Sequence, residues 1–239
     1  IRDSQNIMLL WERYDSMSKL ETNKKKKRDS LLDSAFSLFT SKGINKTSIS
    51  DIAEKSGVAK GTFYLYFKDK YDLRNRLIAH KASQLFHNAD EALAKSGITD
   101  LTEEIIFIAD HIINQFCEDK SLLLFISKNL SWGIFKSSLT NPSTDDEVDF
   151  YDIYSRILDR ADYNLKDPEI MLFMIIELAS STCYSSILYE EPTSIDILKP
   201  YLYDSIRGII KRHTISNLED TDINLSLIHI SEPTRPRLI

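Results

Sequence analysis

Cysteine is scarce in this sequence, since only Cys117 and Cys183 occur among its 239 residues. The two residues form no CxxC pair and no paired framework, which argues against a secreted domain held together by disulfides. Neither has the adjacent basic residue that favours a redox-sensing thiolate. We therefore expect two reduced core thiols in a cytoplasmic protein.

Glycine and proline are also scarce, at six residues each, and this favours long helices over a β fold with many turns. No segment approaches about 18 uninterrupted apolar residues, and no signal-peptide pattern is present, so we expect neither a membrane span nor export. The motifs GxSxG, GxGxxG and HExxH and the P-loop are missing, so we expect no enzyme and no cofactor. His80 and His87 lack a third ligand, which disfavours a metal site.

Positive charge is concentrated in one part of an acidic chain. The formal net charge is −6, which by itself argues against a nucleic-acid partner. Residues 24–70, however, contain eleven Lys or Arg and five Asp or Glu, a net charge of +6, and the remainder carries −12. A basic segment attached to an acidic body is typical of a DNA-binding head on a regulatory domain.

The basic segment begins with the run Lys24–Arg28 and continues into an apolar stripe at helical spacing. The stripe predicts a first helix over about Lys25–Lys42, with Gly43 as its C-terminal cap. The basic run itself either contacts phosphates or the minor groove, or is a solvated arm.

Two shorter helices are predicted next. Ser48, followed three residues later by Asp51, is an N-cap candidate for a helix that ends at Gly57. A third helix from about Ala59 to Tyr64 or Leu65 would bury the apolar residues Val58, Phe63 and Phe67. Two short helices joined by a tight glycine-containing turn form a helix-turn-helix, whose second helix enters the major groove of DNA.

The outward side of this motif suits a DNA surface. Lys60 supplies charge for a phosphate or a guanine edge, Gly61 allows close approach of the backbone, and Thr62 offers a hydroxyl and a methyl group. Tyr64 and Tyr66 can donate to phosphates, although both could instead be core aromatics.

The run TSISDIAEKSGVAKGTFYLYFKDKYDL resembles the sequence signature of the TetR/AcrR family of bacterial regulators, and the resemblance extends over about Asp29–Leu77. It implies an all-α fold with a three-helix helix-turn-helix head and a helical body that binds ligand and dimerises. It also implies a set of DNA contacts: Thr47, Ser48 and Ile49 at the start of the second helix, Ala59, Lys60, Gly61 and Thr62 on the recognition helix, and Tyr64, Tyr66 and Lys70 at phosphates. Two positions depart from the family pattern, because Ala59 replaces a frequent Ser and Tyr66 replaces a frequent His.

After Lys70 the pattern becomes one of long helices. We expect them over about Asp69–Ala94, Thr99–Cys117, Ser121–Phe135, Glu147–Ala161, Asp167–Tyr189 and Ser194–Arg212. The helix after Pro168 is apolar on nearly all sides, so it should be buried on all sides. The resemblance implies that the last two helices, about 167–189 and 194–212, pair with those of a second subunit; a purely intramolecular core helix is the alternative.

The resemblance further implies an effector pocket in the body, suited to a small apolar or aromatic molecule. The candidate lining residues are Phe107, His111, Trp132, Phe135, Tyr151, Tyr154, Phe173 and Glu177. The predicted function is a transcriptional regulator, in first place a repressor that a small-molecule effector releases from a double-stranded DNA operator. The alternative is a helix-turn-helix regulator controlled by a protein partner, or an architectural DNA binder, without such a pocket.

The composition also suggests a division of the chain. We expect residues 1–23 to be an extension in which Met17 resembles a natural start, although the apolar stretch Met8–Trp11 could form a short helix. Residues 24–72 would be the helix-turn-helix domain and residues 73–215 the regulatory and dimerisation domain. Residues 216–239 are expected to be a disordered tail, of which 225–239 resembles translated vector sequence.

Overall fold

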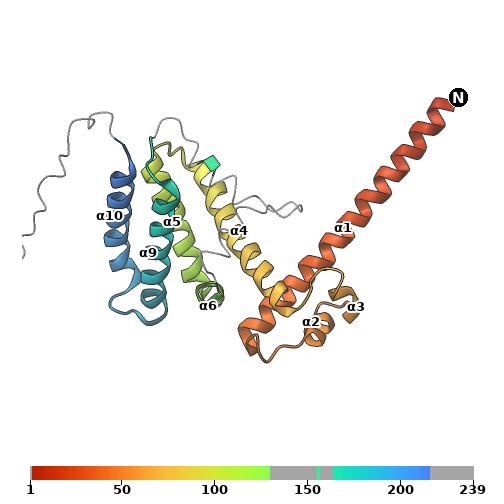
Figure 1. Cartoon of the computed structure of the whole chain (residues 1–239), viewed down its shortest axis with the longest axis horizontal. Helices are drawn as coiled ribbons and strands as arrows, with labels where there is room; N and C mark the ends of the chain where they lie inside the picture. Colours follow the sequence, from red (N-terminus) through yellow and green to blue (C-terminus); the bar gives the residue numbers. More distant parts are fainter. Residues whose placement is uncertain (1, 130–154, 157–163, 216–239) are drawn as a thin grey trace, which may run out of the picture.

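The computed structural model describes residues 2–129, 155–156 and 164–215 (Figure 1). Within these ranges no strand occurs, apart from an isolated bridge between Leu165 and Thr214. The all-α prediction is therefore confirmed. The helices are α1 (Arg2–Lys42), α2 (Ile49–Lys55), α3 (Lys60–Phe63), α4 (Lys70–Ser96), α5 (Leu101–Glu118), α6 (Lys120–Asn129), α9 (Pro168–Tyr189) and α10 (Ile195–His213).

Helix α1 is much longer than predicted, because it begins at Arg2 rather than near Lys25 and projects from the head as one rod (Figure 1). The chain from Arg2 to Lys42 contains no Gly or Pro, and lysine is a good helix former. An established helix can therefore propagate through the basic run. It ends where predicted, since Gly43 adopts a left-handed φ of +83° and its N–H donates to Phe39 O at 3.1 Å.

The other described helices agree with the predicted spans to within about two residues at most ends. Asp69 caps α4 by accepting hydrogen bonds from the N–H groups of Asp72 and Tyr71, and these bonds hold the pKa of its carboxyl below the usual range. The predicted helix Ser121–Phe135 begins at Lys120 and is described as far as Asn129. The predicted helix Glu147–Ala161 lies outside the described residues, apart from 155–156.

The head has a core of its own that also includes part of the body. Phe63 and Phe67 of the head pack with the buried face of α4 and with Phe125 and Ile126 of α6. The head is therefore attached to the body through both α4 and α6, and the boundary expected at residues 72–73 falls inside α4. The domain division itself stays a prediction.

Helices α5, α9 and α10 and the second half of α4 enclose the body core (Figure 1). Cys183 belongs to this core, and burial raises the pKa of its thiol to about 11, as expected for an inert thiol.

Across α5 and α10, Asp110 accepts hydrogen bonds from Tyr203 and from Lys199, whose Nζ lies 2.7 Å away. Burial opposes ionisation of Asp110, but these hydrogen bonds hold its pKa below the ordinary value.

The expectation that the apolar helix is buried on all sides is wrong for the single chain. One face of α9 packs into the core, whereas Ile170, Phe173, Met174 and Tyr189 are exposed. Among the described helices, α9 alone is long and apolar enough to cross a membrane by length and composition. Its packing against α10 and α5, however, is that of a bundle helix with one uncovered side.

Candidate DNA-binding interface

The predicted N-cap at Ser48 is confirmed, and a reciprocal pair of hydrogen bonds fixes the start of α2. Asp51 N–H donates to Ser48 Oγ at 3.1 Å, and Ser48 N–H donates to Asp51 Oδ2 at 3.0 Å. This capping box satisfies main-chain donors that the first turn leaves without partners. The same hydrogen bonds hold the pKa of Asp51 below its usual range.

The turn between α2 and α3 is closed by main-chain hydrogen bonds. Gly57 has a φ of +70°, a left-handed conformation that costs glycine little. Gly57 N–H donates to Glu54 O, and Val58 N–H donates to Ala53 O at 3.0 Å. This is the Schellman arrangement, which turns the chain sharply and sets the angle between the two helices.

Helix α3 is shorter than predicted, at four residues from Lys60 to Phe63. Its N-cap residue Ala59 offers no side-chain hydrogen bond, and beyond Phe63 the chain tightens into bonds between residues three apart. Phe63 and Phe67 anchor this turn in the head core, because both are completely or almost completely buried, as predicted.

The outward side of α3 presents most of the predicted contact residues to solvent. Ala59, Lys60 and Gly61 are exposed, Tyr64 is 53% exposed, and Thr62 is half-buried. Lys60 makes no ion pair or hydrogen bond with the part of the chain that the structure describes. A Cβ atom added at Gly61 would meet nothing within 4 Å, so the main chain there is open to a close partner.

Two of the predicted contact residues, Tyr66 and Ile49, are partly buried in the head core. Tyr66 is half-buried against the head core, and its ring lies 6.4 Å from that of Phe67. Ile49 is likewise half-buried, whereas Ser48 is exposed.

Sequence reasoning missed Leu65, which is 80% exposed beside Tyr64. The signal was present, because Phe63 and Phe67 share a buried side and leave the residue midway between them on the other side.

The Thr47 side chain is turned into the head in the free chain, and the predicted contact of this residue with DNA stays a prediction. Thr47 is 1% exposed, and its hydroxyl donates to Gly43 O at 2.9 Å, with Leu38 O at 3.4 Å. A buried hydroxyl needs an internal acceptor, and these carbonyls at the end of α1 supply it. Thr47 therefore shapes the loop between α1 and α2.

Lys70 has a structural role in the DNA-free chain, and its predicted contact with a phosphate stays a prediction. Its Nζ donates to Ile44 O at 2.9 Å, Thr47 O at 3.1 Å and Asn45 O at 3.4 Å. An ammonium group has three N–H donors, so this geometry leaves none for a phosphate. Lys70 fastens the α1–α2 loop to the first turn of α4.

The basic run lies on α1 rather than in an extended arm. Lys24, Lys25, Lys26 and Lys27 are exposed, and Arg28 is half-buried. The run adjoins the part of α1 that packs against α2 and α4, so its charge is carried by the head (Figure 1).

The predicted effector-pocket residues are not gathered into one pocket by the described part of the chain. Phe107 and His111 are half-buried on α5, with stacked rings whose centroids are 6.2 Å apart. Phe173 and Glu177 are exposed on α9, and their place in an effector pocket stays a prediction. The remaining four, Trp132, Phe135, Tyr151 and Tyr154, lie outside the described residues.

Comparison with known proteins matches the head to a family of bacterial regulators. Residues 31–77 match the family model described as bacterial regulatory proteins of the tetR family. The head therefore matches the DNA-binding segment of the TetR family. The matched segment runs from the buried face of α1 through α2 and α3 into α4. It contains the predicted contact residues from Thr47 to Lys70, whereas the basic run Lys24–Arg28 precedes it.

The curated relatives that this chain matches include helix-turn-helix regulators. It is 44% identical over 66 residues to the uncharacterized regulator YvdT of Bacillus subtilis, covering 27% of this chain and 32% of that protein. It is 40% identical over 102 residues to the regulator AcrR of Shigella flexneri, covering 41% of this chain and 46% of that protein. With the Bacillus subtilis fatty acid metabolism regulator protein it shares 35% identity over 74 residues, 31% of this chain and 38% of that protein. The matched regions thus span about a third to a half of these relatives.

Solved structures extend the similarity of the fold to the body. The fatty acid degradation regulator FadR from Bacillus halodurans superposes with a TM-score of 0.56 at 18% identity, covering 75% of this chain and 97% of that one. Bacillus subtilis FadR in complex with stearoyl-CoA gives a TM-score of 0.55 at 19% identity, covering 74% and 96%. At this identity the similarity concerns the all-α architecture alone.

Proposed function

We propose that this chain is a DNA-binding transcriptional regulator that places α3 in the major groove. The observation that carries the proposal is the two-sided structure of the turn after α3. Phe63 and Phe67 anchor it in the head core, while Lys60, Gly61 and Tyr64 face outward. A recognition helix requires this division between an anchored side and a free polar side.

Each outward residue has a role that its chemistry suits. Lys60 offers an unpaired ammonium to a guanine edge or a phosphate, and Thr62 offers a hydroxyl and a methyl group to a base. The hydroxyls of Tyr64 and Tyr66 suit phosphate oxygens, and exposed Ser48 at the start of α2 suits the opposite backbone. Leu65 adds an apolar contact of the kind that a thymine methyl group accepts.

The proposal includes a homodimer formed through α9 and α10. Ile170, Phe173 and Met174 are exposed on α9, and Ile197 and Tyr201 are exposed on the neighbouring α10. Apolar side chains exposed on two adjacent helices favour burial against a partner, and a second copy would add a second head for a two-fold operator.

A ligand would control this dimer in the cytoplasm, most simply by releasing a repressor from its operator. The relatives support this class of mechanism, since BepR of Brucella suis is a transcriptional repressor and FadR of Bacillus subtilis was crystallised with stearoyl-CoA. The half-buried pair Phe107 and His111 marks the part of α5 where an aromatic or apolar effector would lie in the body.

Footprinting on the DNA upstream of the chain's own gene tests the proposal. We expect a protected two-fold site, to which Lys60→Gln binds about tenfold or more weakly, because one good base contact contributes about 1–3 kcal/mol of discrimination. Lys95→Gln is the matched control, because Lys95 is exposed at the far end of α4, and it should bind like the wild type. Equal affinities for all three proteins would contradict the proposal.

Repeating the footprint with stearoyl-CoA, and with shorter apolar and aromatic acids, tests control by an effector. Loss of protection at a saturable concentration is the expected result. Protection that no such compound changes would instead support regulation through a protein partner.

A further inference from the structure

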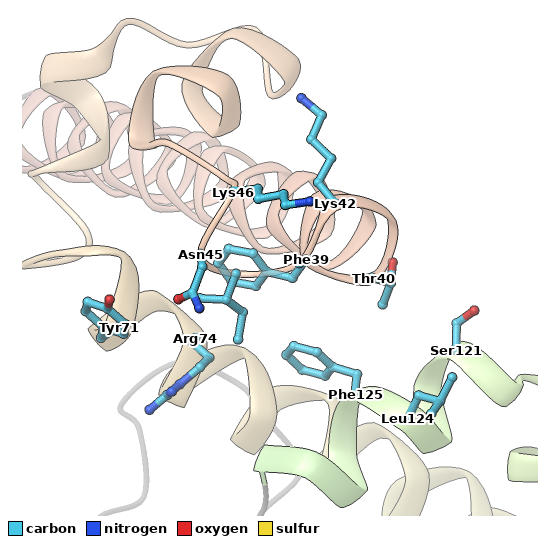
Figure 2. Close-up of a pocket in the computed structure, with 12 residues that line it drawn as sticks. Phe39, Thr40, Lys42, Asn45, Lys46, Tyr71, Arg74, Ser121, Leu124 and Phe125 are labelled. Carbon is cyan, nitrogen blue, oxygen red and sulfur yellow. The ribbon is translucent and has the colours of Figure 1, made fainter.

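A pocket of about 650 Å³ opens at the joint between the head and the body (Figure 2). The end of α1 and the loop after it form one wall, the first turns of α4 form a second, and α6 forms a third. The pocket lies apart from the α5 residues to which we assign the body effector. Its lining residues are Phe39, Thr40, Lys42, Gly43, Ile44, Asn45, Lys46, Tyr71, Arg74, Ser121, Leu124 and Phe125.

The pocket has an apolar interior. Phe39 of the head and Phe125 of α6 face each other with nearly parallel rings, their centroids 6.5 Å apart and their planes 17° apart (Figure 2). Ile44 and Leu124 extend this surface on the two sides of the joint. A flat or narrow apolar group could therefore lie against both the head and the body.

The polar lining carries positive charge only. Lys42, Lys46 and Arg74 line the pocket, and none of the lining residues is Asp or Glu. Lys46 makes no ion pair or hydrogen bond with the described part of the chain. The Arg74 guanidinium shares two N–H donors with Asn75 Oδ1 and lies 5.7 Å from the centre of the Tyr71 ring. The Lys42 side chain points away from Phe39 and Phe125 and interacts with Asp51, so Lys46 is the lysine that an amphipathic anion would meet (Figure 2).

We propose that this pocket binds a small amphipathic anion, an aromatic or aliphatic acid whose charged group meets Lys46. Its apolar part lies against the half-buried Ile44 and Leu124, beside the buried rings of Phe39 and Phe125. The volume is within the range of about 300–1,000 Å³ that is usual for small-molecule sites. Such a ligand contacts head and body at once, so it is sensitive to the angle between them.

The pocket is connected to the helix-turn-helix by a short stretch of chain. Asn45 and Lys46 line it, Thr47 follows in the buried loop, and Ser48 is the N-cap of α2. An anion held there neutralises positive charge on the head, whose attraction for DNA phosphates then falls. The effect on DNA rests on the proposed function, whereas the binding of the anion does not.

The test uses the full DNA-free chain titrated with 8-anilinonaphthalene-1-sulfonate, an aromatic anion whose fluorescence rises in apolar sites. Lys46→Gln removes a cation on the head side, and Ser121→Glu adds a repelling carboxylate on the body side. An acidic residue in the first turn of α6 suits the helix, so the second variant should fold normally. Both variants should raise the dissociation constant by about threefold or more, whereas Lys95→Gln should leave it unchanged.

Unchanged probe affinity in both variants, with wild-type circular dichroism, would overturn the proposal. Weaker DNA binding by Lys46→Gln without any change in probe binding would also overturn it, because the lysine would then serve a phosphate. In a separate titration, saturating probe should weaken operator binding by about fivefold or more in the wild type and by less in Lys46→Gln. Failure of the proposed function appears as absent operator binding and leaves the probe result intact.

Discussion

Ala59 occupies the N-cap of α3 with φ −67° and ψ 146°, the extended conformation that a capping serine adopts, yet it provides no cap. We expect Ala59→Ser to increase the free energy of unfolding by about 0.5–1 kcal/mol, because the new hydroxyl can accept a main-chain N–H bond. Urea denaturation measures the change. Ala94→Ser, at an exposed position within α4, is the control and should be neutral or slightly destabilising. A loss of stability in Ala59→Ser would contradict the expectation.

Lys70 gives the second prediction for a single residue. Lys70→Met leaves three carbonyls of the α1–α2 loop without their donor. We expect a loss of about 1–3 kcal/mol in the free energy of unfolding, together with weaker operator binding. The control is Lys68→Met, an exposed lysine two residues earlier, which should change stability by less than about 0.5 kcal/mol. Unchanged stability with a lower salt dependence of DNA binding would restore the phosphate role.

These residues show what the sequence alone could and could not predict at the site. The capping box at Ser48 and the buried side of the motif depend on local spacing, so both were predictable. The direction in which Thr47 and Lys70 point depends on carbonyls at the end of α1 and in the α1–α2 loop. The family resemblance implied DNA contacts for both, but the hydrogen bonds of Lys70 depend on packing between segments over 20 residues apart.

At the scale of helices, most boundaries follow from caps and breakers, and most predicted spans agree with the structure. The N-terminal extent of α1 was not predictable in this way, because no residue between Arg2 and Lys42 stops or favours its propagation decisively. Helix α9 gives the opposite lesson. Its composition showed that it must be covered, but could not show that one side would be left open in a single chain.

The connection between α5 and α10 should depend on pH. The pKa of Asp110 in the folded chain lies below its ordinary value of 3.8, so the stabilisation is present above that value and is lost as the pH falls through the folded pKa. After a discount for solvent exposure, Asp110→Asn should lower the free energy of unfolding by about 1 kcal/mol at pH 7. The difference from the wild type should vanish in strong acid. Asp204→Asn, a more exposed aspartate on α10, should show a smaller effect at every pH.

At the scale of the whole molecule, the uncovered sides of α9 and α10 predict the state of association. Phe173→Glu places a charge within the exposed apolar surface, so we expect sedimentation analysis to show dissociation of the dimer at micromolar concentration. Leu65→Glu is the matched control, because Leu65 is also an exposed apolar residue but lies in the head, and it should remain dimeric. A wild-type chain that sediments as a monomer would contradict the assignment of this surface.

The continuity of α1 has a mechanical consequence. From Arg2 to Leu31, where the helix enters the head core, the rod measures about 44 Å at about 1.5 Å per residue. A head rotation of about 10° would therefore carry the far end of a rigid rod by about 8 Å. A fluorophore at the N-terminal end of α1, paired with one on α10, would therefore report small changes in head angle as large changes in energy transfer.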